Sequence, residues 1–209
     1  WKGLFPALIT PYDQHGRVDE QALRTLVRHL LKRNVDGFYV GGSTGEGFLQ
    51  TAEERKRVLE VAVDEIAGAV PVIAHVGTMD TKTAEELAAF AEQVGANAVS
   101  AVTPFYYKHA LPELKQHYMD IANASELPLI VYHFPALTGV SVPVDFYAEL
   151  SQHERIVGVK FTSKDLFEME RLMDECGRTF AVFNGHDECL LAAMAVGATM
   201  IIKSKRTYC

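Results

Sequence analysis

The amino-acid sequence predicts a closed (β/α)8 barrel, an α/β fold, and three observations lead to this fold class. Short apolar runs rich in Val, Ile and Ala alternate with amphipathic stretches along the whole chain. Continuous apolar strands separated by helices indicate a parallel sheet that is covered on both faces. The strands number about eight, which favours a closed barrel over an open doubly wound sheet. No G-x-G-x-x-G motif follows the first strand, so the usual dinucleotide-binding fingerprint is missing.

The predicted elements follow one another in strict alternation. The first helical stretch has leucine and valine side chains three and four residues apart, at Leu23, Leu26, Val27, Leu30 and Leu31. The apolar runs predict strands at 3–11, 37–42, 72–77, 98–104, 129–134, 157–162, 180–185 and 199–203. The amphipathic stretches predict helices at 19–33, 51–67, 81–94, 112–124, 143–150, 164–175 and 188–196.

Composition limits the class of protein. The 209 residues suffice for one large domain, and 48% hydrophobic with 22% charged residues is typical of a soluble globular protein. The formal net charge of −7 argues against a nucleic-acid surface. We expect no membrane span, signal peptide or transit segment. The three cysteines, Cys176, Cys189 and Cys209, lack metal-type spacing and fit reduced thiols in a cytoplasm.

One lysine lies in a predicted strand. The stretch 156–162 is apolar and β-branched, with Lys160 near its C-terminal end. In an edge strand such a lysine would be solvated or would snorkel to the surface. In a sheet buried on both faces its pKa would fall, and the neutral amine could attack a carbonyl carbon to form a Schiff base. Catalytic groups of a (β/α)8 barrel gather at the C-terminal ends of the strands, so the predicted fold favours a catalytic Lys160.

Polar side chains also gather at other predicted strand ends. Ser43 and Thr44 lie in a glycine-rich turn that lacks a Walker lysine. The turn could be only a tight connection, or its hydroxyls and backbone N–H groups could hold a small carboxylate. Tyr132 is either a core tyrosine with a satisfied hydroxyl or a proton shuttle beside the lysine. We expect Tyr106 and Tyr107 to line the wall of the pocket.

The histidines at predicted strand ends have either a functional or a structural interpretation. The run His186, Asp187 and Glu188 could suggest a metal site, but three adjacent residues rarely converge on one ion. Hydrogen bonding to a polyhydroxylated substrate is the better interpretation. We expect His75 and His133 to be buried core residues.

Four motifs occur in order along the chain. They are GGSTGE at 41–46, TPFYY at 103–107, VYHFP at 131–135 and GVK at 158–160. Together they resemble the pyruvate-dependent class I aldolases of the N-acetylneuraminate lyase and dihydrodipicolinate synthase family, from residue 3 to about residue 198. Within that family, 135–139 and 183–188 resemble the sialic acid lyase branch. The synthase branch has an arginine where this chain has Leu137.

The resemblance implies a reaction and a set of roles. Lys160 would form a Schiff base with open-chain N-acetylneuraminate, and Tyr132 would take the C4 hydroxyl proton, releasing N-acetylmannosamine and pyruvate. Ser43 and Thr44 would bind the pyruvyl carboxylate. The full set of implied substrate contacts is Ser43, Thr44, Thr162, Gly185, Asp187, Glu188 and Ser204. No metal or diffusible cofactor is implied. A homotetramer is implied, in which Tyr107 can reach a neighbouring site.

The end of the chain departs from the family. Bulky Met200, Ile201 and Ile202 replace glycines, and we expect the domain 1–209 to lack the last barrel helix and the C-terminal helical tail. A barrel without that helix is expected to be a poor enzyme, because apolar surface stays uncovered. Two alternative functions stay open. One is another pyruvate-dependent aldolase, acting on a 2-keto-3-deoxy sugar acid or resembling dihydrodipicolinate synthase, and the other is a truncated non-catalytic homologue.

Overall fold

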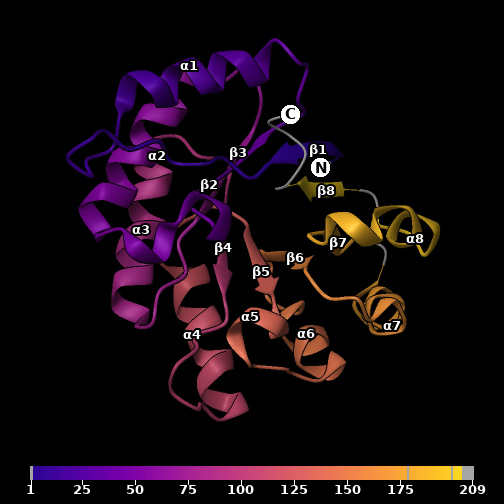
Figure 1. Cartoon of the computed structure of the whole chain (residues 1–209). Helices are drawn as coiled ribbons and strands as arrows, with labels where there is room; N and C mark the ends of the chain where they lie inside the picture. Colours follow the sequence, from indigo (N-terminus) through magenta and orange to yellow (C-terminus); the bar gives the residue numbers. More distant parts are fainter. Residues whose placement is uncertain (1, 178, 199, 204–209) are drawn as a thin grey trace.

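The structure of the protein is a computed structural model, and it describes residues 2–177, 179–198 and 200–203. The strands are β1 (Gly3–Pro6), β2 (Phe38–Val40), β3 (Val72–His75), β4 (Ala98–Val102), β5 (Leu129–His133), β6 (Ile156–Phe161), β7 (Ala181–Asn184) and β8 (Met200–Lys203). They form one parallel sheet in the order β1-β8-β7-β6-β5-β4-β3-β2. A parallel bridge between Ala7 and Tyr39 joins the two ends of this sheet. The predicted (β/α)8 barrel is therefore confirmed, with its helices outside the strands (Figure 1).

Four of the helices begin at side-chain caps that the sequence provides. The longer helices are α1 (Glu20–Leu31), α2 (Ala52–Ile66), α3 (Thr81–Gln93), α4 (Leu111–Asn123), α6 (Val144–Leu150), α7 (Leu166–Cys176) and α8 (Leu190–Ala195). Asp19, Asp80 and Asp165 each accept a hydrogen bond from a backbone N–H in the first turn of α1, α3 and α7. Thr51 and Glu54 form a reciprocal capping box at α2. These caps fix where each helix leaves its strand.

Two predictions about elements need correction. The first strand ends at Pro6 rather than at residue 11, because the chain leaves β8 there and Ala7 bridges β2 instead. A short helix that the sequence analysis did not predict, α5 (Pro135–Thr138), follows β5 and ends at Gly139, whose φ is +68°. Three 3-10 turns, η1 (Ser43–Gly45), η2 (Gly47–Leu49) and η3 (Asp187–Cys189), follow strands β2 and β7.

The barrel has two apolar layers. Inside the strands lies a cluster that includes Phe5, Tyr39, Ile73, Tyr132 and Phe183. Between the strands and the surrounding helices lies a larger cluster of aliphatic and aromatic side chains. Both layers remove the strands from water, so a side chain that points into the barrel is desolvated unless it reaches the open C-terminal end.

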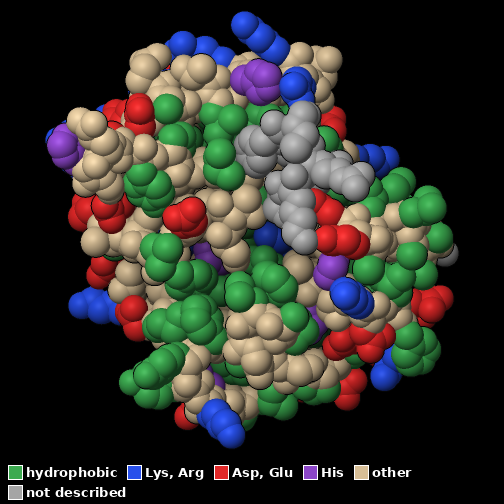
Figure 2. Space-filling model, viewed as in Figure 1, with side chains coloured by type: hydrophobic (Ala, Val, Ile, Leu, Met, Phe, Trp, Pro, Cys, Tyr) green, Lys and Arg blue, Asp and Glu red, His purple; other side chains and the backbone are tan. Residues whose placement is uncertain are grey.

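The surface is mixed in character. In the view of Figure 2, hydrophobic side chains gather in the region of α4 and α5, and acidic and basic side chains alternate around the edge. The exposed large hydrophobic residues of that region include Tyr106, Tyr107, Leu111 and Leu137. Within the described part of the chain, every helix is too short or too polar to span a bilayer.

Candidate active site

Lys160 lies inside the barrel near the C-terminal end of β6 and is only 5% exposed. Its amine contacts the faces of two tyrosine rings, 3.9 Å from the ring centre of Tyr39 and 3.8 Å from that of Tyr132. Burial lowers the pKa of Lys160 to about 7, and the carboxylate of Asp187 opposes this shift. At that pKa about half of the amines are neutral at pH 7, against ~0.03% for an ordinary lysine. A nucleophilic amine is therefore available at neutral pH.

Tyr132 is the neighbour of Lys160 in the sheet, because β5 and β6 pair these two residues. Burial raises the pKa of Tyr132 to about 12, and the nearby hydroxyls of Ser43 and Thr162 oppose the rise. The phenol is therefore protonated at neutral pH. The Oγ1 atom of Thr162 is buried but forms no hydrogen bond of good geometry within the described residues, so it can accept a substrate partner.

The loop that follows β2 brings Ser43 and Thr44 to the cavity. Its carbonyl at Gly45 accepts hydrogen bonds from Thr10 Oγ1 at 2.7 Å and from Gln50 Nε2 at 3.0 Å. The backbone of Gly47 passes so close to the preceding turn that a Cβ atom there would lie 2.1 Å from a carbonyl oxygen. Only glycine fits this approach, so the glycine-rich sequence has a steric reason.

The turn after β7 forms the opposite wall. A Cβ atom on Gly185 would lie 2.0 Å from Thr162 Oγ1 and 3.3 Å from Lys160 Cε, so the backbone lies directly against the reactive lysine. His186 Nδ1 lies 2.9 Å from the carboxylate of Glu188. The imidazole thus lies beside the Glu188 carboxylate, and the negative charge of Asp187 acts on the Lys160 amine.

These side chains surround a single cavity of about 140 Å³. Its lining includes all the described residues that the sequence analysis gave as catalytic or substrate-binding: Ser43, Thr44, Tyr132, Lys160, Thr162, Gly185, Asp187 and Glu188. His186, which the sequence predicts as part of a substrate-binding run, lines the cavity too, and three more lining residues were not predicted as contacts: Ala7, Phe134 and Ile202. Ala7 and Ile202 become neighbours of the site only through closure of the barrel, which no local motif encodes.

Two other predicted residues lie elsewhere. Tyr106 and Tyr107 do not line this cavity; their exposed fractions are 85% and 69%, and their rings pack against each other. The backbone φ of Tyr106 is +79°, an unusual value for a tyrosine. Ser204 lies outside the described residues.

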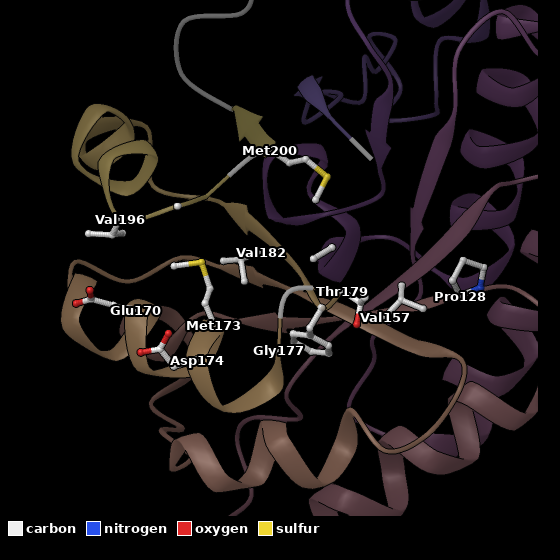
Figure 3. A pocket seen from close by; sticks show the side chains of 13 residues that line it. Pro128, Val157, Glu170, Met173, Asp174, Gly177, Thr179, Val182, Val196 and Met200 are labelled. Carbon is white, nitrogen blue, oxygen red and sulfur yellow. The ribbon is translucent and has the colours of Figure 1, made fainter.

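A second cavity, of about 930 Å³, lies at the other end of the barrel (Figure 3). It is lined by residues at the N-terminal ends of β6, β7 and β8, such as Val157, Ala181 and Met200, and by Glu170 and Asp174 of α7. It is larger, but it contains no lysine or tyrosine, so it does not offer the chemistry found around Lys160. Among the residues that the structure describes, no three His, Cys, Asp or Glu side chains come together as metal ligands.

Comparison with known proteins agrees with this geometry. The model of the Dihydrodipicolinate synthetase family matches residues 1–208. N-acetylneuraminate lyase of Clostridium perfringens is 43% identical over 204 residues, which are 97% of this chain and 70% of that protein. The structure of CdNal from Clostridium difficile in complex with mannosamine has a TM-score of 0.93 at 42% identity, covering 96% of this chain and 69% of that one. For dihydrodipicolinate synthase of Aquifex aeolicus the TM-score is 0.96 at 34% identity, with 99% and 71% covered. The chain belongs to the dihydrodipicolinate synthetase family, and its close relatives include N-acetylneuraminate lyases.

Proposed function

We propose that the protein is a class I aldolase, a carbon–carbon lyase that cleaves N-acetylneuraminate into N-acetylmannosamine and pyruvate through a Schiff base on Lys160. One observation carries the proposal: a desolvated lysine, with its pKa lowered to about 7, faces a cavity shared with a tyrosine hydroxyl. The 43% identity to N-acetylneuraminate lyase of Clostridium perfringens, against 34% to the synthase of Aquifex aeolicus, supports the choice of substrate.

The reaction starts when the neutral amine of Lys160 attacks the C2 keto carbon, and loss of water gives a protonated imine. The C3–C4 bond then breaks, its electron pair moves to C3, and the imine becomes an enamine. The C4 hydroxyl loses its proton and becomes the aldehyde of N-acetylmannosamine. A proton delivered to C3 restores the imine, and water releases pyruvate and the free lysine. Each step uses side chains and water, so the proposal requires no metal or diffusible cofactor.

Tyr132 would move the proton from the C4 hydroxyl. Because its phenol is protonated at neutral pH, it can accept that proton only while it passes its own to a neighbour. The hydroxyls of Ser43 and Thr162 adjoin it and can complete such a relay. Ser43 and Thr44 would hold the pyruvyl carboxylate beside the imine carbon.

The sugar end would lie against the turn after β7. Gly185, Asp187 and Glu188 line the cavity there, and carboxylates suit the hydroxyl groups of a sugar. Leu137 of α5 is exposed and offers no cation for a second carboxylate. This arrangement favours sialic acid over aspartate semialdehyde, the carboxylated partner of the synthase reaction.

Borohydride trapping tests the chemistry. Incubation with pyruvate and borohydride is expected to leave a covalent adduct on the peptide that contains Lys160. Lys160→Arg should give no adduct and no turnover, because a guanidinium does not lose its proton to become a nucleophile. The matched control Lys164→Arg changes an exposed lysine four residues away and should keep both. A folded protein without an adduct on Lys160 would overturn the proposal.

Kinetics test the substrate. We expect kcat/KM for N-acetylneuraminate cleavage to exceed that for addition of pyruvate to aspartate semialdehyde by roughly 10- to 100-fold, the value of one missing charge-assisted contact. The reverse preference would place the protein with the synthases, and a preference for a 2-keto-3-deoxy sugar acid would indicate a third kind of aldolase.

We further propose a homotetramer located in the cytoplasm. Tyr106, Tyr107, Leu111 and Leu137 are large apolar side chains exposed on the surface, which supports an interface between copies. Cys176 and Cys189 are free thiols, as expected in a reducing compartment. Light scattering of the purified protein measures the assembly.

A further inference from the structure

Arg55 is a buried cation that has no carboxylate partner among the residues described by the structure. It lies in the first turn of α2, is 7% exposed, and takes part in none of the ion pairs between described residues. Its guanidinium donates instead to two carbonyls of one segment, that of His75 at 2.7 Å and that of Gly77 at 3.0 Å. Burying a charge in this way costs free energy that an apolar side chain would not cost. The arrangement therefore calls for a reason other than stability.

The two carbonyls explain the choice of arginine. In an extended segment the carbonyls of residues two apart point to the same side, where one planar guanidinium can reach both. Arg55 thus fixes the segment in which β3 leaves the sheet. Burial lowers the pKa of Arg55 to about 10, so it remains charged at neutral pH.

His75 extends this contact to the residue after β2 and to the end of β4. Its Nδ1 lies 3.2 Å from the carbonyl oxygen of Gly41, which can only accept a hydrogen bond. Its Nε2 accepts a hydrogen bond from the backbone N–H of Val102 at 3.3 Å. These partners require a proton on Nδ1 and a lone pair on Nε2, so His75 is neutral in one defined tautomer. The contact of 3.3 Å between Arg55 and Nδ1 brings two donors together and adds no hydrogen bond.

The hydrogen bond to Gly41 and the packing of the His75 ring both connect His75 to the candidate active site. Gly41 directly precedes the loop that carries Ser43 and Thr44. The His75 ring packs edge-on against the ring of Tyr132, with 5.9 Å between centres, and near Tyr39 at 6.1 Å. Tyr39 and Tyr132 are the two rings that enclose the Lys160 amine.

We propose that Arg55 and His75 form a positioning pair: Arg55 fixes the end of β3, and His75 from there holds the Ser43–Thr44 loop and supports the Tyr132 ring. The proposal rests on the proposed function, since that function gives the loop and the tyrosine their roles. Neither residue touches the cavity, so both act through their neighbours.

Burial and two nearby cations keep the imidazole neutral. Burial lowers the pKa of His75 most, the cations Arg55 from α2 and Lys160 from β6 lower it further, and the hydrogen bond to the Gly41 carbonyl opposes this shift. The aromatic residues Tyr39 from β2 and Tyr132 from β5 carry no charge near neutral pH, because burial raises their pKa values. Nitrogen NMR of labelled histidine, assigned by loss of the signal in a His75 variant, should therefore give a neutral ring protonated on Nδ1. A ring protonated on Nε2, or on both nitrogens, at pH 7 would overturn the proposal.

Two substitutions of His75 separate its hydrogen bond to Gly41 from its hydrogen bond with Val102. His75→Asn places an amide nitrogen close to the position of Nδ1 and can keep the hydrogen bond to Gly41. His75→Gln places an amide oxygen close to the position of Nε2 and can keep the hydrogen bond from Val102. Both lose the ring beside Tyr132, so both should lower kcat. Only His75→Gln releases the loop, so only it should raise the half-saturating pyruvate concentration in borohydride trapping.

We expect that increase to be about tenfold or more in His75→Gln and less than about threefold in His75→Asn, as the loss of one positioning hydrogen bond at a buried site would give. Arg55→Met should behave like His75→Gln, and Arg55→Lys should recover part of the loss. Arg57→Met on the same helix removes only surface ion pairs. It should change neither kcat nor the half-saturating pyruvate concentration. Ile66→Val, in the core of α2, should lower Tm without changing the pyruvate constant.

The outcomes are distinct. A wild-type protein that forms no pyruvate adduct contradicts the proposed function. An adduct in the wild type with equal pyruvate constants in the two His75 variants contradicts the positioning pair. An equal rise of the half-saturating pyruvate concentration in Ile66→Val would assign the effect to stability. That result would also contradict the positioning pair. If His75→Gln does not fold, Arg55→Met against Arg55→Lys and the imidazole spectrum decide.

Discussion

At the scale of single residues, the pKa of Lys160 sets the pH at which the reaction can begin. The neutral amine is the nucleophile, and burial places its pKa at about 7. We therefore expect kcat/KM to rise with pH through an apparent pKa of about 7 and then to level off. Asp187 raises this pKa, so Asp187→Asn should move the rise to lower pH. A pH profile whose acid limb lies near 10, or does not move in the variant, would contradict the assignment.

The hydroxyl of Tyr132 is the second residue-scale feature. Tyr132→Phe keeps the ring beside Lys160 and removes only the proton relay, so kcat should fall by roughly 10²- to 10⁴-fold with a smaller change in KM. Tyr39→Phe is the matched control, because the Tyr39 ring also covers the amine while its hydroxyl contacts Ser100 at 3.1 Å, inside the barrel. Its loss of kcat should be much smaller. Comparable losses in the two variants would make Tyr132 a packing residue.

At the scale of elements, the backbone of the turn after β7 packs closely against the lysine. Gly185→Ala would place a methyl group against Thr162 and Lys160, and overpacking of this kind costs about 1–3 kcal/mol. If the displaced atoms are those of the site, kcat/KM should fall roughly 10- to 100-fold. Gly68→Ala is the control, since its methyl group meets no atom within 4 Å although its φ of +73° is strained. It should lower stability and leave kcat/KM unchanged.

Most elements could be predicted because their signal is local. The helices begin within two residues of their predicted starts, since apolar periodicity and capping residues mark them. Helix α5 was missed because four residues are too few for periodicity, although a proline at its start and Gly139 at its end mark it. The end of β1 was placed too late, because the apolar run continues after Pro6 while its pairing partner changes from β8 to β2.

The residues of the site also divide into those that the sequence could predict and those that it could not. The residues around Lys160 lie at strand ends, and the fold class alone places strand ends together. His75 was predicted to be a core residue, and its burial is confirmed. Its tautomer could not be predicted, because its partners come from Gly41 and Val102, which are far apart in the sequence. Likewise no motif indicates that Arg55 reaches the end of β3.

At the scale of the whole molecule, three histidines are buried in the neutral form. Burial lowers the pKa of His117 and of His133 to about 4, and that of His75 well below its ordinary value. His117 accepts or donates one hydrogen bond with Thr81 at 2.8 Å, and His133 one with Tyr147 at 2.6 Å. His117 lies in α4 and contacts α3, and His133 lies at the end of β5 and contacts α6. Protonation of these rings would therefore affect contacts between several elements of the barrel.

This burial predicts loss of stability in mild acid. Each folded-state pKa lies below the unfolded value of about 6.5, so the unfolded chain takes up protons first and the stability present above pH 6.5 is lost as the pH falls toward 4. His117 and His133 would each remove about 3 kcal/mol over that range, at ~1.4 kcal/mol per pH unit. Glu168 acts in the opposite direction, because burial raises its pKa, but it is only partly buried. The sum rivals the roughly 5–15 kcal/mol by which a domain is stable.

Urea unfolding at pH 7, 5.5 and 4.5 should therefore give a steep fall in the midpoint. His117→Asn, which can keep a hydrogen bond to Thr81, should make that fall shallower, and an unchanged pH dependence would contradict this account.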